Sequence, residues 1–327
     1  MRRREFITLL GGATAVWPLL ARAQQRAMPV VGLLSSESPE LDAFRIAALR
    51  QGLREMGYNE GQNIALEYRG AKDHNDRLSD LASDLVRRPV SVLVTLGGTV
   101  VALAAKAASN TVPTVFLIGG DPVKSGLVAS LSRPGGNVTG VSFLSTALLQ
   151  KQLEVIHEVV PNAALIGLLI NHSNPLADSQ IKDLQAAAKK LNQKIFIVKA
   201  ANESEIEAAF GTLSQQRVGA LVVVGDPLFT SRSEQLAALT VRHAVPTIYL
   251  YRKFAAAGGL LSYGTDITDA YRVAGVYTGR ILKGDKPADL PVQQSTKVEL
   301  IINLKTAKTL GITIPPSLLG RADEVIE

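Results

Sequence analysis

The sequence predicts an α/β protein with two similar lobes, each built on a parallel β-sheet covered by helices. Three observations predict this fold. The chain has 327 residues, 46% of them hydrophobic, which is enough for two separate cores. Short runs rich in valine, isoleucine and leucine alternate with amphipathic stretches from Pro29 onward. The same order of elements returns in the second half, which favours two lobes over one large α/β domain.

The predicted elements follow one another in the same order in both halves. In the first half we expect strands at 29–34, 63–69, 91–96 and 113–118, and helices at 41–56, 76–88 and 100–108. In the second half we expect strands at 164–170, 194–200, 220–224 and 246–251, and helices at 176–191, 203–216 and 231–243. Apolar residues recur every three or four positions in the helical stretches. Right-handed crossovers between consecutive strands then give parallel sheets with helices on both faces.

Residues 1–23 have the pattern of a cleavable signal peptide. Three arginines precede an apolar stretch at 6–20, and Ala21-Arg22-Ala23 supplies an A-x-A cleavage pattern. Residues 3–7 also resemble a twin-arginine export signal. The alternative, an uncleaved membrane anchor, fits less well because the stretch is short and contains two glycines and a proline. We therefore expect a mature protein that begins at Gln24 and is soluble in the periplasm.

The composition excludes several classes of function. There is no cysteine, which excludes disulfides, thiolate zinc sites and cysteine nucleophiles. Residues 1–23 hold four arginines and one glutamate and so carry half of the formal net charge of +6. No block of basic residues remains in the rest of the chain to bind nucleic acid. The chain lacks a G-x-S-x-G elbow, a P-loop and a G-x-G-x-x-G motif, and its four histidines are scattered. We therefore expect no catalytic residue, no cofactor and no metal.

Small polar residues follow several strands of the first half. Ligands of open parallel sheets bind beyond the carboxyl ends of the strands, so these residues are candidate ligand contacts. The candidates here are Ser35, Ser36, Thr95, Gly97, Gly98 and Thr99. The sequence TLGGT (95–99) presents free backbone N–H groups and hydroxyls at a helix start, which suits a carboxylate. The alternative is a glycine-containing helix cap that binds nothing.

Two Asp-Pro pairs follow strand-like runs, at Asp121 and Asp226. Aspartate at the N-cap with proline at the next position is a common helix start and explains both pairs without a ligand. A carboxylate at a strand end can also receive an ammonium group. Asp226 follows the third strand of its half and Asp121 the fourth strand of its own, so the two positions are not equivalent.

Further candidates follow strands of the second half. Asn171 and Asn174 lie in the sequence NHSNP, where their amides suit either a loop cap or a polar ligand. Phe229 and Tyr251 follow the third and fourth strands and suit either the core or the wall of a ligand site. Both alternatives stay open from the residues alone.

Several stretches resemble one known family. They are AALRQGLREMGYNEGQNIALEYR, GGDPVKSGLVASLSRPGGNVTGVSF, LINHSNP, FAAAGGLLSYG and INLKTAKTLGITIPPSLLGRADEVI. The chain resembles periplasmic substrate-binding components of ABC transporters, in the family that contains binders of tryptophan and other aromatic amino acids. The resemblance implies a type I periplasmic-binding-protein fold, with two Rossmann-like lobes, three crossovers and a ligand in the cleft. It also implies lobe 1 at 28–140 plus about 264–286, and lobe 2 at 141–263 plus about 287–327.

The resemblance also implies roles and partners. Thr95, Gly97, Gly98 and Thr99 would receive a ligand carboxylate and Asp226 its amino group, whereas Asp121 would serve mainly as a cap at the cleft edge. The ligand would be an amino acid, with an aromatic one favoured, or an aromatic carboxylate that lacks the amine. A membrane permease would be the protein partner of a monomer. The alternatives are a binding protein that presents its ligand to a membrane receptor, and a periplasmic α/β enzyme.

Overall fold

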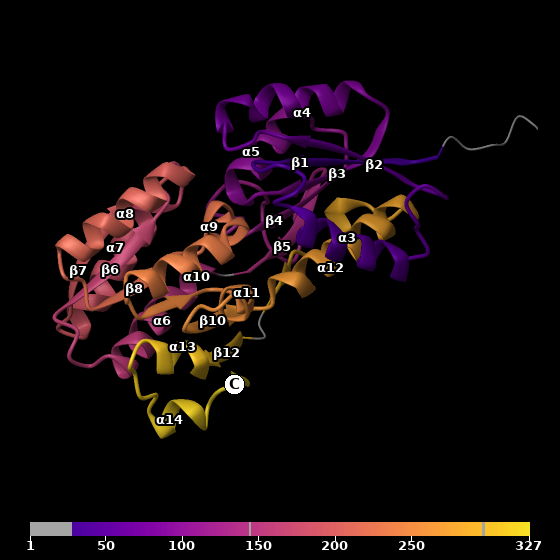
Figure 1. Cartoon of the computed structure of the whole chain (residues 1–327). Coiled ribbons are helices and arrows are strands. Elements are labelled where there is room, and N and C mark those ends of the chain that lie inside the picture. The colour runs from indigo at the N-terminus through magenta and orange to yellow at the C-terminus, as the bar shows by residue number, and fades with distance from the viewer. Residues whose placement is uncertain (1–27, 144, 296–297) are drawn as a thin grey trace, which may run out of the picture.

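Two separate β-sheets form the cores of two lobes (Figure 1). The structure is a computed structural model that describes residues 28–143, 145–295 and 298–327. Lobe 1 contains residues 28–143 and 266–295, and lobe 2 contains residues 145–265 and 298–327. This arrangement confirms the predicted α/β class with two mostly parallel sheets. The predicted signal peptide at 1–23 lies outside the described residues.

Lobe 1 has a six-stranded parallel sheet in the order β11-β5-β4-β3-β1-β2. Its elements are β1 (Val30–Ser35), α3 (Ala43–Glu55), β2 (Ala65–Gly70), α4 (Leu78–Arg87), β3 (Val90–Leu96), α5 (Gly98–Ala108), β4 (Thr114–Ile118), β5 (Val138–Ser142), α12 (Ile267–Leu282) and β11 (Gln293–Gln294), with 3₁₀ turns at Asn75–Arg77 and Pro287–Asp289. Val31 and Val94 pack on the face covered by α3 and α12, whereas Leu34 and Leu93 pack on the face covered by α4 and α5. Both faces of the sheet are therefore buried, which explains its nearly continuous apolar strands.

Lobe 2 has a seven-stranded sheet in the order β13-β12-β10-β9-β8-β6-β7, with β12 antiparallel to β10. Its elements are α6 (Ser145–Val159), β6 (Leu165–Ile170), α7 (Ala177–Lys190), β7 (Lys194–Lys199), α8 (Glu203–Gln215), β8 (Ala220–Val223), α9 (Pro227–Ser231), α10 (Ser233–Arg242), β9 (Thr247–Tyr249), α11 (Arg252–Ala256), β10 (Leu261–Thr265), β12 (Val298–Asn303), α13 (Leu304–Thr309), α14 (Pro316–Leu319) and β13 (Glu324–Ile326). The strands β7-β6-β8-β9-β10 repeat the order of β2-β1-β3-β4-β5 in lobe 1, which confirms the predicted similarity of the lobes.

The chain passes between the lobes three times, after Phe143, Thr265 and Ser295. The expected lobe boundaries at 140/141, 263/264 and 286/287 come too early. β5 still pairs with β4 up to Ser142, and β10 pairs with β12 up to Thr265. The third boundary moves furthest because β11 pairs with β5 and so belongs to lobe 1. β5 and β10 thus complete their pairing within their own sheets before the chain crosses to the other lobe.

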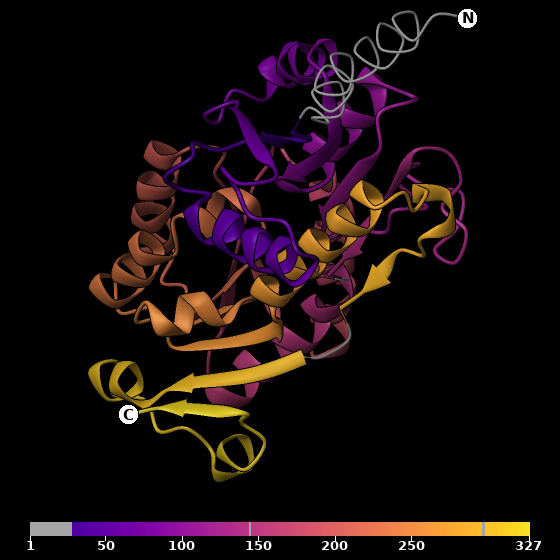
Figure 2. The same cartoon turned by 90° about the vertical axis from the view of Figure 1, so that its right-hand side faces the viewer.

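Two glycines let α3 and α12 cross at close range on one face of lobe 1. The two helices lie side by side in Figure 2, α3 in indigo and α12 in orange. A Cβ atom added to Gly52 would overlap the backbone carbonyl oxygen of Arg272, and one added to Gly275 would overlap that of Leu49. Any side chain at either position would therefore force the helices apart.

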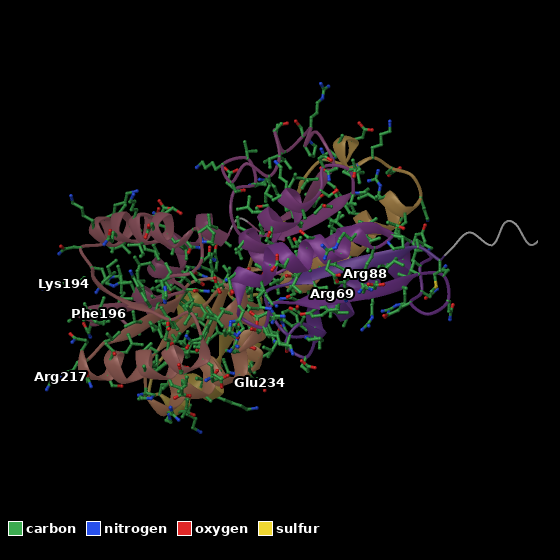
Figure 3. All side chains as sticks on the ribbon, turned by 90° about the horizontal axis from the view of Figure 1, so that it is seen from above. Arg69, Arg88, Lys194, Phe196, Arg217 and Glu234 are labelled. Carbon is green, nitrogen blue, oxygen red and sulfur yellow. The ribbon has the colours of Figure 1, made fainter. Side chains whose placement is uncertain are left out.

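Charged side chains are dispersed over the surface of both lobes (Figure 3). On lobe 1, Arg69 and Arg88 both pair with Asp84, at 2.9 and 3.4 Å. Figure 3 shows Lys194 and Arg217 at the far end of lobe 2. The partly exposed ion pairs of Asp84 with Arg69 and Arg88 contribute little to stability. No helix in the described part of the chain is long and apolar enough to cross a lipid bilayer.

Replacing Gly52 by alanine should destabilise lobe 1 by about 1–3 kcal/mol, because the added methyl group meets backbone that cannot move aside. Chemical denaturation followed by circular dichroism measures the change. Gly211 is the matched control: it also lies in a helix, and its added Cβ would have no neighbour within 4 Å. Alanine there should be neutral or stabilise by about 0.5–1 kcal/mol. Equal effects at the two positions would contradict the close helix crossing.

Candidate ligand-binding site

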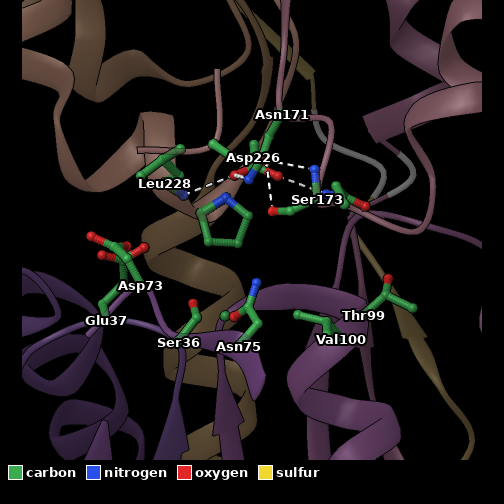
Figure 4. Close-up of a pocket in the computed structure, with 14 residues that line it drawn as sticks. Ser36, Glu37, Asp73, Asn75, Thr99, Val100, Asn171, Ser173, Asp226 and Leu228 are labelled. Carbon is green, nitrogen blue, oxygen red and sulfur yellow. Dashed lines mark hydrogen bonds between the residues drawn. The ribbon is translucent and has the colours of Figure 1, made fainter. Parts of the chain in front are cut away.

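The carboxyl ends of the strands of both lobes face a common cleft, where two adjoining cavities lie. We call the first the polar cavity (Figure 4); Ser36, Glu37, Asp73 and Asn75 line it from lobe 1, and Asn171 and Ser173 from lobe 2. We call the second the aromatic cavity; Phe143, Tyr251, Tyr271, Leu176, Ile267 and Arg45 line it. Thr99, Asn174, Asp226 and Pro227 line both cavities.

Asp226 is a buried carboxylate at the junction of the two cavities. Its Oδ1 accepts hydrogen bonds from the Asn171 amide at 3.0 Å and from the Leu228 backbone N–H at 2.9 Å. Its Oδ2 accepts from the Asn174 amide at 2.6 Å. Burial raises the pKa of Asp226, and these three hydrogen bonds oppose that rise. A carboxylate has about four acceptor positions, so one remains for a donor from a ligand.

The two asparagines that hold Asp226 are themselves fixed by the loop after β6. The side-chain oxygen of Asn171 accepts from the backbone N–H and hydroxyl of Ser173, at 3.0 and 2.8 Å. The side-chain oxygen of Asn174 accepts from the Leu176 N–H at 2.9 Å. With each oxygen already used, each amide nitrogen must face Asp226. The sequence NHSNP therefore serves both as a loop cap and as a support for the carboxylate.

The N-terminus of α5 forms the opposite wall of the cleft. Gly97 is the N-cap and Gly98 the first helical residue, with φ of 152° and 77°. An added Cβ at Gly97 would lie 2.5 Å from the Ser36 hydroxyl oxygen, and one at Gly98 would lie 3.2 Å from Pro227 across the cleft. Glycine is needed here for both backbone conformation and close approach. As the N-cap, Gly97 offers no side chain to cap the first turn of α5, so the N–H groups of that turn can bind a carboxylate.

Arg45 is a buried cation that the sequence analysis missed. It extends from α3, is 1% exposed, pairs with Asp42, and donates to the carbonyl oxygen of Pro227 in lobe 2 at 3.2 Å. A signal was present, because Arg45 lies on the same helix face as the buried residues Ala48, Leu49 and Gly52. A charged residue on an apolar helix face must find a partner inside the protein.

Eight of the twelve predicted contacts line the cavities. In the polar cavity these are Ser36, Gly97, Thr99, Asn171, Asn174 and Asp226. In the aromatic cavity they are Gly98, Thr99, Asn174, Asp226 and Tyr251. Asp226 also caps α9, with Pro227 at the first helical position as the sequence indicated. Direct contact of these residues with a ligand stays a prediction.

The structure places the other four predicted contacts outside both cavities. Ser35 is buried and donates its hydroxyl to the Leu96 carbonyl oxygen at 2.6 Å, and Thr95 is buried within β3. Phe229 is a fully buried core residue of α9. Asp121 accepts from the N–H groups of Val123 and Lys124 and so closes a turn, not a helix. The structure therefore does not support direct ligand contacts for these four.

Three acidic or cationic residues connect the lobes at the edge of the polar cavity, and sequence reasoning missed all three. Arg232 of lobe 2 reaches Asp73 of lobe 1 at 2.6 Å and Glu37 at 3.4 Å. Burial raises the pKa of Glu37 to about 7; Arg45 and Arg232 oppose that rise, whereas Asp73 and Asp42 add to it. In the described part of the chain, no group of three or more histidine, aspartate and glutamate residues is arranged to hold a metal ion.

Comparison with known proteins places this geometry among binding proteins. Residues 33–326 match the family model described as ABC transporter substrate binding protein. The tyrosine-binding protein of Clostridioides difficile (strain R20291) is 30% identical over 277 residues, which cover 84% of this chain and 79% of that protein.

Two solved structures are also similar. An ABC domain from Streptococcus pneumoniae in complex with L-Trp has a TM-score of 0.80 at 28% identity, covering 92% of this chain and 100% of that one. The ligand-free, open structure of a substrate binding protein with adhesive properties from Clostridium difficile has a TM-score of 0.62 at 25% identity, covering 91% and 99%. Identity and coverage thus differ little between the two, whereas the TM-scores differ clearly.

Replacing Glu37 by glutamine should stabilise the protein at pH 8 by on the order of 2 kcal/mol. The folded-state pKa is about 7 against an ordinary 4.5, so the folded protein binds more protons between these values and loses stability as the pH rises through this window. Glutamine cannot ionise and avoids that loss, so the gain should vanish below pH 4.5.

Urea denaturation of the wild type and variant at pH 8, 6 and 4 measures this dependence. Glu207→Gln is the control, because Glu207 is an exposed partner of Arg242 in a pair within lobe 2. A Glu37→Gln variant that is no more stable than the wild type at pH 8 would contradict a buried carboxylate with a raised pKa.

Proposed function

The chain belongs to the family of ABC transporter substrate-binding proteins, and we propose that it captures an aromatic amino acid between its lobes and delivers it to a membrane permease. One observation carries the choice of ligand: a cavity walled by Phe143, Tyr251 and Tyr271 adjoins both a buried carboxylate and an uncapped helix N-terminus. The site thus offers groups for an anion, a cation and a ring within one cleft.

Each part of an aromatic amino acid has a matching group in the cleft. The α-carboxylate binds the free N–H groups at Gly98 and Thr99, where the helix dipole favours negative charge. The α-ammonium group donates to the remaining acceptor position of Asp226. The ring enters the aromatic cavity, where Phe143 and Tyr251 stand edge to face with ring centres 6.3 Å apart. The bound amino acid stays chemically unchanged, as a substrate-binding protein requires.

The comparisons support this choice of ligand. One relative is named for tyrosine, and one similar structure holds L-Trp. The higher TM-score to the L-Trp complex than to the open structure supports a closed relation of the two lobes in this protein. Capture then proceeds by hinge motion at the three crossovers: the open lobes admit the ligand and close around it. Water leaves the cleft on closure, which strengthens the charged contacts.

The N-terminal sequence supports a location outside the cytoplasm. The pattern of residues 1–23 suits a cleaved, twin-arginine-type signal, which exports a protein already folded. We place the mature protein in the periplasm as a monomer. There its closed form is the one that docks on the permease.

A thermal-shift screen of the mature protein from Gln24 tests the proposed ligand, after unfolding and refolding to remove any carried-over ligand. Tyrosine, tryptophan and phenylalanine should each raise the melting temperature by several degrees, because a ligand at a hundred times its Kd stabilises by about 2.7 kcal/mol. Asp226→Ala should lose most of this shift. Sugars and aliphatic amino acids should give little.

Asp121→Ala is the matched control for Asp226→Ala. Asp121 also precedes a proline but closes a turn outside both cavities, so its variant should keep the full ligand shift. If no aromatic amino acid shifts the wild type, the proposed ligand class is wrong. If Asp121→Ala loses the shift as fully as Asp226→Ala does, the assignment of the ammonium group to Asp226 is wrong.

A further inference from the structure

In the described part of the chain, three cationic side chains join the lobes across the cleft, and none of them is a predicted ligand contact. Arg232 pairs with Asp73 and Glu37, Arg45 donates to the Pro227 carbonyl oxygen, and the Lys253 ammonium group lies 4.1 Å from the centre of the Phe44 ring. Each contact needs the two lobes to be close together. The contact at Arg232 is the one with opposite charges on the two sides.

The local structure of lobe 2 directs Arg232 toward lobe 1. α9 ends at Ser231 and α10 begins at Ser233, and Arg232 itself leaves helical geometry, with φ −106° and ψ 30°. Its side chain is only 9% exposed, although it lines neither the polar nor the aromatic cavity. Burying a guanidinium group is costly unless charged partners surround it. Here both acidic partners come from the opposite lobe, and Asp73 makes the shorter contact, at 2.6 Å.

The local structure of lobe 1 directs those partners toward Arg232. Lys72 and Asp73 both adopt left-handed backbone conformations, with φ of 53° and 65°. The Asp73 N–H donates to the Ser36 carbonyl oxygen at 2.8 Å, and the Ser35 hydroxyl accepts from the Glu37 N–H at 3.0 Å. Two successive non-glycine residues in this region carry backbone strain, which persists only where the surrounding contacts hold it.

We propose that Arg232 is a closure latch, a positioning residue that holds the lobes together over the ligand through its ion pair with Asp73, with Glu37 as a second hydrogen-bond acceptor. This inference rests on the proposed function only in that closure serves ligand capture. Opening the cleft separates Arg232 from the carboxyl groups of Asp73 and Glu37 and returns all three side chains to water. Because Arg232 and Glu37 are almost fully buried, their arrangement affects the closed state more than an exposed ion pair would.

A latch predicts a particular kinetic pattern. The ligand enters the open form, in which the latch is not yet made, so loss of Arg232 should leave the association rate close to that of the wild type. The dissociation rate should rise on the order of tenfold, because the closed state is less populated. A residue that only supported the fold of lobe 2 would not produce this division between the two rates.

Distance measurements between the lobes test the latch directly. The chain has no cysteine, so spin labels at Val123→Cys in lobe 1 and Lys182→Cys in lobe 2, both exposed, report lobe separation without competing sites. Arg232→Gln should move the distance distribution toward longer separations, both without added ligand and with saturating tyrosine or tryptophan. Stopped-flow measurements with the same amino acids give the two rates. Arg242→Gln is the matched control, because Arg242 lies on α10 and pairs with Glu207 inside lobe 2.

The outcomes separate this proposal from the proposed ligand. An unchanged distance distribution and dissociation rate in Arg232→Gln would overturn the latch, as would an equal effect of Arg242→Gln. If Arg232→Gln fails to fold, Asp73→Asn tests the same pair from the other lobe and must shift the distribution in the same direction. If no amino acid alters any distribution, the proposed ligand class fails, while the arm without ligand still decides on the latch.

Discussion

A carboxyl group that is largely removed from water, and whose pKa burial raises, is the constraint on which the cleft depends. Asp226 can hold an ammonium group only if it is ionised, yet burial alone pushes it toward its neutral form. The loop after β6 counters this with two amides whose oxygens are already occupied, and the start of α9 adds a backbone N–H. The loop after β6 and the start of α9 after β8 therefore set the electrostatics of the site as well as its architecture.

The two lobes contribute complementary parts of one charge arrangement. Lobe 2 supplies Asp226, and lobe 1 supplies the N-terminus of α5 and the guanidinium group of Arg45. At the edge of the cleft the positive group comes from the other lobe: Arg232 belongs to lobe 2, and its acidic partners Asp73 and Glu37 belong to lobe 1. Arg45 also pairs with Asp42 of its own lobe, whereas Arg232 pairs with acidic residues of the opposite lobe. Bringing the lobes together makes the contacts of Arg232, which links the energy of closure to the edge of the ligand site.

The fold could be predicted from the sequence because its signals are local and repeated. Strands buried on both faces give continuous apolar runs, and the helices between them show one apolar face. Asp226 and the two glycines of α5 could be found because they follow strand ends in the chain. Glu37 and Asp73 could not, because their partner Arg232 is distant in sequence and nothing beside them marks the contact. Asp121 misled for a related reason: Asp-Pro starts a helix in one lobe and a turn in the other.

Residues beside the first two crossovers also line the aromatic cavity. Phe143 directly follows β5, and Ile267 is the first residue of α12 after the second crossing. If the proposed ligand binds here, its ring would lie close to the crossovers between the lobes, where a small difference in ring size would change the angle between the lobes. A two-ring side chain would hold the lobes further apart near the crossovers than a one-ring side chain would. Under the proposed function, the outline that the closed protein presents to a permease would then vary with the size of the bound side chain.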